Sequence, residues 1–256
     1  MKNQKDFIKK AISNKNLDFR LYFNKKYQNK NIHKWYQKNV IVRPSFDILD
    51  VGCGTGAQSI FFSKKINKKG NLYAFDKSNI SVINLKKKIP GKNNKIFVAD
   101  MNRFDQINKK YFQNIKFDFI NSVYSIYYAK KPMQLILKLI SKLKKGGQLV
   151  IFLPMKPNKV AELAAKFYKL PEKVMQSLDF YKKIKYFYRK KNFSYKIKYF
   201  RSKMKIDNID DLMMFYKSTT FYNRNYENKI YTLLKKKYIN KFFIFKKDSC
   251  LITLTK

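Results

Sequence analysis

Three aspartates lie at the ends of short apolar runs, and their type and spacing could do chemistry. Asp50 lies near the end of the first run, Asp76 ends the second, and Asp100 follows the third. Because the carboxyl ends of parallel strands meet at one edge of a sheet, we expect the three carboxylates to lie close together. In a chain with only 16 acidic residues, this placement predicts a site for a positively charged ligand.

A glycine-rich segment adjoins the first of these aspartates. Residues 48–56 read Ile-Leu-Asp-Val-Gly-Cys-Gly-Thr-Gly, which predicts a buried strand, a tight turn and a helix that opens at Ala57. Glycine suits such a turn because the backbone bends sharply and a ligand must approach without meeting a Cβ. Gly52-x-Gly54-x-x-Ala57 also matches the dinucleotide fingerprint, so an NAD enzyme is the alternative. Asp50 argues against NAD, since its carboxylate would repel a pyrophosphate but suits an α-ammonium group.

The other two aspartates narrow the choice of ligand. Asp76 could accept hydrogen bonds from ribose hydroxyls, which fits NAD and other adenosyl ligands alike. Asp100 could accept a hydrogen bond from an adenine amino group. Together the three carboxylates predict a site for a positively charged adenosyl ligand.

These residues need a parallel sheet to bring them together. Short apolar runs beside glycines predict five strands, with helical stretches between them. Regular alternation of strand and helix is typical of a doubly wound α/β fold with helices on both faces of the sheet. The predicted strands are Asp47–Val51, Asn71–Phe75, Lys95–Ala99, Phe117–Ser122 and Gln148–Leu153, and the helices include Ala57–Ile66, Ser78–Ile89 and Pro132–Lys145, the last capped by Gly146.

The rest of the chain predicts additions to this core. Two apolar runs, Phe242–Phe245 and Cys250–Thr255, are joined by Lys-Lys-Asp-Ser and predict a β-hairpin. This hairpin would complete a seven-stranded, mostly parallel sheet with an antiparallel edge. The predicted segments are an N-terminal helical lid (1–40), a ligand-binding core (41–154), a cap or substrate region (155–240) and the closing hairpin (241–256).

The motifs within residues 47–154 resemble those of class I S-adenosylmethionine-dependent methyltransferases. Residues 48–56 resemble the family's motif I, residues 117–122 its strand-four motif, and residues 143–151 its turn into strand five, with Lys145 where proline is usual. The resemblance implies a Rossmann-like fold, S-adenosyl-L-methionine as cofactor, and in-line methyl transfer that relies on orientation. It assigns Asp50, Gly52, Gly54 and Gly56 to the methionine part, Asp76 to the ribose, Asp100 and Met101 to the adenine and Ser122 to the sulfonium, and Cys53 and Lys77 complete the predicted set.

Few residues are candidates for catalysis. His33, the single histidine, has a side chain whose pKa suits a general base, although a lone histidine in a helix is more often structural. Tyr124 begins the aromatic run 124–128, which could line an acceptor pocket or pack as a helix on the sheet. One histidine and the two cysteines, Cys53 and Cys250, cannot build a typical zinc site, so we expect no metal.

The net charge of +42 has two interpretations. One is a polyanionic partner such as RNA. The other is AT-rich codon usage, which we favour because Asn, Ile, Phe and Tyr are abundant while Gly (7) and Pro (6) are scarce. Only six of the 58 basic residues are arginine, the residue that nucleic-acid surfaces prefer for bidentate contacts.

Three functions stay open at this stage. We favour methyl transfer to a small-molecule or lipid-linked acceptor, because Asn121-Ser122-Val123-Tyr124 lacks the prolines of nucleic-acid amino-group methylases. The alternatives are an RNA methyltransferase that uses the basic surface, and a non-catalytic protein that binds the cofactor or RNA. No run of about 18 apolar residues predicts a membrane span, although the basic N-terminus allows a peripheral membrane contact. We expect a cytoplasmic protein, and no pattern indicates an oligomeric state.

Overall fold

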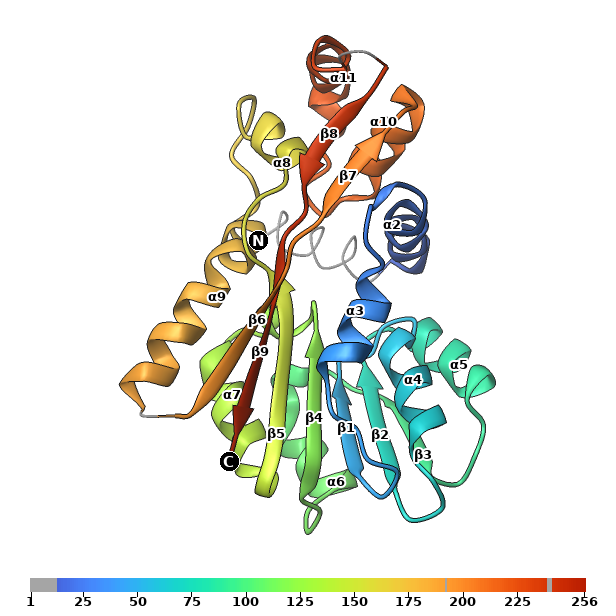
Figure 1. Ribbon diagram of the computed structural model, residues 1–256, viewed down its shortest axis with the longest axis vertical. Helices are drawn as coiled ribbons and strands as arrows, with labels where there is room; N and C mark the ends of the chain where they lie inside the picture. Colours follow the sequence, from blue (N-terminus) through green and yellow to red (C-terminus); the bar gives the residue numbers. More distant parts are fainter. Residues whose placement is uncertain (1–12, 192, 239–240) are drawn as a thin grey trace.

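A seven-stranded sheet forms the base of the computed structural model, which describes residues 13–191, 193–238 and 241–256 (Figure 1). The strand order is β3-β2-β1-β4-β5-β9-β6. The first five strands in the chain pair in parallel, and β9 runs antiparallel to both β5 and β6. The strands are β1 Asp47–Val51, β2 Asn71–Asp76, β3 Asn94–Val98, β4 Phe117–Val123, β5 Leu143–Pro154, β6 Tyr195–Phe200 and β9 Ser249–Thr255. The predicted doubly wound, mostly parallel fold is therefore confirmed.

Helices cover both faces of this sheet because its strands are apolar on both sides. Ile48 belongs to one buried cluster with residues of α3, α4 and α5, whereas the next residue, Leu49, belongs to the cluster with α6, α7 and α9. The helices are α3 Ile32–Asn39, α4 Ala57–Lys65 and α5 Asn79–Lys88 on the first face, and α6 Phe104–Tyr111, α7 Pro132–Ser141 and α9 Glu172–Lys190 on the second.

A second group of elements stands above the carboxyl ends of the parallel strands (Figure 1). It has its own buried cluster, in which Phe23 of the N-terminal helix packs edge-on against Phe215 at a ring distance of 5.7 Å. We call this group the helical cap. It consists of α2 Asn14–Tyr27, α8 Lys159–Ala164, α10 Ile209–Ser218 and α11 Glu227–Lys236, with the two-stranded antiparallel sheet of β7 Lys203–Ile206 and β8 Phe243–Lys246.

The C-terminal strands are antiparallel as predicted, but the prediction that residues 242–245 and 250–255 pair as a hairpin is wrong. β8 pairs with β7, and β9 pairs with β5 and β6, so the two runs continue each other across Lys247 and Asp248. Ser202 and Lys247 keep the ribbon paired through this junction, because the Lys247 amide donates to the Ser202 carbonyl at 2.9 Å. The physical reason is that the two runs bury their apolar residues in different cores, one in the cap and one at the sheet. The outer edge of the sheet is consequently β6.

Other details of the prediction also need correction. The predicted helix 132–145 ends at Ser141, and the fifth strand already begins at Leu143, so Gly146 lies within β5 and caps no helix. The division into four segments stays a prediction, and residues 1–12 of the predicted lid lie outside the described residues. None of the helices in the described ranges is long and apolar enough to span a membrane.

Candidate functional site

A cavity of about 400 Å³ lies between the carboxyl ends of the parallel strands and the helical cap. Its volume is in the range of small-molecule sites, and its place is where open α/β sheets bind ligands. The sheet side contributes the glycine turn, the ends of β1 to β3 and the segment after β4. The cap side contributes residues of α2, α8 and α10, the loops beside α8 and α10, and the junction of β8 and β9.

Two glycines of the turn have a left-handed backbone conformation that residues with a side chain rarely adopt. The amides of Gly52 and Cys53 both donate to the Phe75 carbonyl, at 2.9 and 3.0 Å, which ties the turn to the second strand. Gly52 has φ +71°, and a Cβ there would come within 2.5 Å of the Ser125 Cβ. Gly54 has φ +52°, and a Cβ at this position would meet only Leu17 of α2, at 3.4 Å. The predicted role of glycine in this turn is thus supported at both positions.

Asp50 lies at the centre of a buried hydrogen-bond network. Its carboxylate accepts hydrogen bonds from Ser59 Oγ at 2.5 Å and Asn121 Nδ2 at 2.8 Å, and the Tyr36 hydroxyl donates to Asn121 Oδ1 at 2.6 Å. Burial raises the pKa of Asp50 to about 6, although these hydrogen bonds oppose the shift and the nearby Asp76 charge adds to it. No cation pairs with this carboxylate among the described residues.

The other two carboxylates are held in different ways. Asp76 accepts from the amides of Gly54 and Ser78, each at 2.8 Å, and burial raises its pKa. For Asp100 burial acts in the same direction, but hydrogen bonds from Asn102 and from the Lys77 ammonium at 2.9 Å prevail and lower the pKa. All three predicted aspartates line the cavity, together with Gly52, Cys53, Gly54, Lys77 and Met101.

A methyltransferase-domain family model matches residues 43–237 of the chain. The chain belongs to the methyltransferase family. Its fold is similar to those of several solved structures at low sequence identity. A protein assigned to the methyltransferases from Bacillus halodurans has a TM-score of 0.62 and 13% identity, with 88% of this chain and 98% of that chain covered. The YcgJ protein from Bacillus subtilis has a TM-score of 0.59 and 14% identity, with 88% and 97% covered.

A third related structure is coclaurine N-methyltransferase bound to N-methylheliamine and S-adenosylhomocysteine. It has a TM-score of 0.51 and 12% identity, with 88% of this chain and 72% of that chain covered. None of the curated protein sequences matches the chain. S-adenosylmethionine is the cofactor of this methyltransferase, and the residues fit it, because Asp50 and Asp76 have only neutral partners in the described chain and the cofactor is a cation.

Two of the predicted cofactor residues are not among those that line the cavity. Gly56 is the N-cap of α4 and packs on Leu85, whose Cδ1 would lie 2.3 Å from a Cβ at position 56. Ser122 is buried, and its hydroxyl shares a 2.7 Å hydrogen bond with Ser125 Oγ. Ser125 itself donates to the Val51 carbonyl and lines the cavity. Of these two serines it is therefore Ser125 that lines the cavity, and the sequence motif did not single it out.

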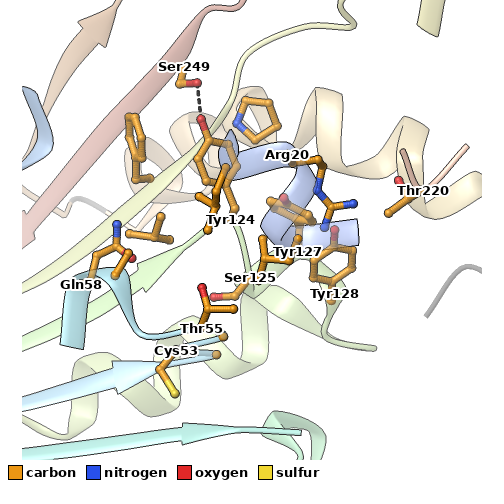
Figure 2. A pocket seen from close by; sticks show the side chains of 18 of the residues that line it. Arg20, Cys53, Thr55, Gln58, Tyr124, Ser125, Tyr127, Tyr128, Thr220 and Ser249 are labelled. Carbon is orange, nitrogen blue, oxygen red and sulfur yellow. Dashed lines mark hydrogen bonds between the residues drawn. The ribbon is translucent and has the colours of Figure 1, made fainter. Parts of the chain in front are cut away.

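Both catalytic candidates of the methyltransferase line the cavity. His33 lies in the first turn of α3, and burial lowers its pKa, so its imidazole is neutral at pH 7. Tyr124 has a left-handed φ of 51°, and its hydroxyl shares a 2.5 Å hydrogen bond with Ser249 Oγ (Figure 2). Burial raises the pKa of Tyr124, so the phenol keeps its proton at neutral pH and does not supply a base.

The aromatic run 124–128 packs partly on the sheet and partly lines the cavity, and its role in an acceptor pocket stays a prediction. Ile126 to Tyr128 form a short 3₁₀ helix, in which Ile126 is buried in the core. Tyr124, Ser125, Tyr127 and Tyr128 line the cavity. The sequence prediction missed the cap side of the cavity, which includes Arg20 of α2 and Lys247 of the strand junction. The spacing of Leu17, Arg20, Leu21 and Asn24 is a one-face helical pattern that could have indicated the first of these.

Proposed function

We propose that this methyltransferase methylates a small-molecule or lipid-linked acceptor, bound in the cavity beneath the helical cap. The observation that carries the proposal is the cover over the cavity. Side chains of α2, α8 and α10 form the wall opposite the glycine turn, and the cavity measures about 400 Å³. A site of this size beneath a packed cap suits a small acceptor better than a folded polynucleotide. The N-methylheliamine complex of the coclaurine enzyme shows the fold holding a small molecule.

The cofactor residues form the second part of the proposal. The backbone at Gly52 and Gly54, with Asp50 beneath it, would hold the methionine part, because the turn is open there and the carboxylate suits an ammonium group. Asp76 would hold the ribose hydroxyls, since each of its oxygens keeps acceptor capacity beside one backbone donor. Asp100 and Met101 would hold the adenine, and Lys77 would position the Asp100 carboxylate.

Catalysis would come mainly from position. Bound S-adenosylmethionine supplies an electrophilic methyl group on a sulfonium. The protein orients the acceptor against it and excludes water with the buried ring of Tyr127 and the half-buried rings of Tyr124 and Tyr128. Where the acceptor must lose a proton, the neutral imidazole of His33 can accept it. Tyr124 would hold the wall of the cavity through its bond to Ser249.

The basic surface is the argument for RNA, and the structure gives part of it another explanation. The Lys- and Tyr-rich segment 181–200 forms α9 and β6, where Ile184 and Tyr188 are fully buried against the sheet. Packing thus explains the buried members of the segment, whereas Tyr186 and Tyr199 are exposed. The buried members give no support to RNA binding, and a cytoplasmic location stays a prediction.

Transfer of labelled methyl groups tests the proposal. The protein is incubated with methyl-labelled S-adenosylmethionine and three fractions of cell extract: low-mass compounds, lipids and RNA. We expect label in the low-mass or lipid fraction and none in RNA. Ribonuclease-sensitive label would establish the RNA alternative. The Gly54→Val protein is the matched blank for all three fractions, since the substitution fills the cofactor turn.

A further inference from the structure

Two cationic side chains from distant parts of the chain line the cap side of the cavity. Arg20 comes from α2, and Lys247 comes from the junction between β8 and β9. Packing of α2 into the helical cap brings them together, and their charges are close enough that Arg20 contributes to lowering the pKa of Lys247. Figure 2 shows the Arg20 side chain beside the rings of Tyr127 and Tyr128, on the side of the cavity that Thr220 also lines.

The described part of the chain gives these two cations only neutral partners. Arg20 Nη1 donates to the Ser218 carbonyl at 2.7 Å, and the Lys247 ammonium donates to Asn24 Oδ1. Neither forms an ion pair with a carboxylate of the described residues. Burial raises the pKa of Tyr127 and Tyr128, so these neighbouring phenols carry no negative charge at neutral pH.

The carboxylates that line the cavity are held elsewhere. Asp248 follows Lys247 in the chain, but its Oδ2 pairs with Arg201 at 3.0 Å and its Oδ1 accepts from the Ser202 amide. The other three, Asp50, Asp76 and Asp100, belong to the opposite end of the cavity with the partners described above. Nothing in the described chain therefore supplies the anion that Arg20 and Lys247 lack.

Leaving two half-buried cations without an anion is unfavourable. Desolvation lowers the pKa of both side chains, to about 7 for Lys247. An arginine nevertheless stays charged in a protein, so its remaining N–H groups need acceptors. Such a cost is typical of a binding site, in which a ligand pairs with charged groups that have no partner in the free protein.

We propose that the methyl acceptor carries an anionic oxygen group, a carboxylate or a phosphate, which binds between Arg20 and Lys247. This inference rests on the proposed function, since it names the class of the acceptor in that site. The anion would be anchored under the cap, and the atom that receives the methyl group would be a different one, nearer the glycine turn. A guanidinium fork with a neighbouring ammonium is a chemistry that suits either anion.

The charge of the product tests this directly on the unmodified protein. The labelled low-mass or lipid product is applied to an anion exchanger at pH 7, with and without phosphatase treatment. We expect retention. Loss of retention after phosphatase identifies a phosphate, and retention that is lost only in acid identifies a carboxylate. A product that is not retained at pH 7 would overturn the proposal.

Variants locate the anion at the two cations. We expect Arg20→Gln and Lys247→Gln each to raise the KM for the acceptor roughly 10- to 100-fold, as expected for a lost hydrogen bond to a charged group. Inorganic phosphate or acetate should compete with the acceptor in the unmodified protein and lose that effect in the double variant. Lys246→Gln and Arg43→Gln, at exposed positions that do not line the cavity, are matched controls that keep the original KM.

Binding of S-adenosylhomocysteine separates this inference from the proposed function. The two variants should bind it as the unmodified protein does, which also shows that they fold. Retained cofactor binding with an unchanged acceptor KM in the double variant would contradict the anion site alone. Absence of methyl transfer in every fraction with the unmodified protein would instead contradict the proposed function.

Discussion

The two ends of the cavity carry opposite charge. At the sheet end, the carboxylates of Asp50, Asp76 and Asp100 face the cavity with Lys77 as their one paired cation in the described chain. At the cap end, Arg20 and Lys247 face it without an anion. The sheet end comes from adjacent strands of the family fold, whereas the cap end is assembled from residues near both ends of the chain.

This difference shows which charges of the chain indicate a ligand and which do not. The net charge of +42 lies mostly on exposed lysines that any solvated surface tolerates, and it does not define a partner. Buried charges are expensive and therefore carry information about ligands. The cavity accordingly predicts a cationic cofactor at one end and an anionic acceptor at the other.

The largest expected effect is the loss of cofactor binding at the sheet end of the cavity. Gly54→Val should abolish binding of S-adenosylhomocysteine, because the side chain enters the cavity at a positive φ where a β-branched residue is strained. Gly146→Val is the matched control, since Gly146 also has a positive φ of 75° but lies in open surroundings away from the cavity. Calorimetric titration of both variants checks the prediction. Cofactor binding by Gly54→Val equal to that of the control would contradict the placement of the turn.

Removal of one carboxylate at the sheet end should cause a smaller loss of cofactor affinity. Asp76→Ala should weaken S-adenosylhomocysteine binding by about 1–3 kcal/mol, because buried polar groups lose a hydrogen-bonding partner. Asp105→Ala is the control, since that carboxylate is 75% exposed, pairs with Lys138 and lies outside the cavity lining. Equal affinity of the two variants in calorimetry would remove Asp76 from the site and leave the acidic end with two members.

The hydrogen-bond network that holds Asp50 can be tested by measuring the stability of the fold. Tyr36→Phe leaves Asn121 Oδ1 without its donor, in the network that holds Asp50. We expect a loss of about 1–2 kcal/mol in the free energy of unfolding. Tyr186→Phe, at an exposed position of α9, should change it little. Urea unfolding of both variants measures the difference, and equal midpoints would show that the network does not stabilise the fold.

The cap end predicts that the free energy of unfolding depends on pH. The pKa of Lys247 falls from 10.5 to about 7 in the folded chain, with Arg20, Lys156 and the Asp248–Arg201 pair as the charged groups on that side of the cavity. Folding therefore releases a proton between these pH values, so the free energy of unfolding should rise with pH. The expected rise is about 1 kcal/mol from pH 7 to 8.

Replacing the lysine isolates this contribution. Lys247→Met should remove that part of the rise, while Lys246→Met, an exposed neighbour, should keep it. Urea unfolding at pH 7, 8 and 9 provides the comparison. The same pH profile in all three proteins would show that Lys247 is not buried as a cation. Above pH 7 the acceptor KM of the unmodified protein should also rise.

The sheet end could be predicted from sequence because its signals are local. Buried strands, the glycine turn and the aspartates that follow the strands all lie within residues 47–100, and the structure brings the three carboxylates to one cavity. Ser122 was assigned to the site by motif position alone. The chain turns sharply at Tyr124, with φ 51°, and it is Ser125 that reaches the cavity.

The cap end could not be predicted because its contacts are distant in sequence. Strand pairing depends on partners far away: β8 meets β7 across an intervening pair of helices, and the sequence near Lys247 resembles a hairpin turn. Arg20 reaches the cavity only because Phe23, on the same helix, packs into the cap. A single sequence shows the helical spacing but not the surface that it meets.

The most direct test of the acidic end compares two adenosyl ligands of opposite charge. S-adenosylmethionine and NAD⁺ are titrated separately into the unmodified protein by calorimetry. The three carboxylates predict saturable binding of S-adenosylmethionine and no binding of NAD⁺, whose pyrophosphate would meet them. Binding of NAD⁺ with no response to S-adenosylmethionine would contradict the account.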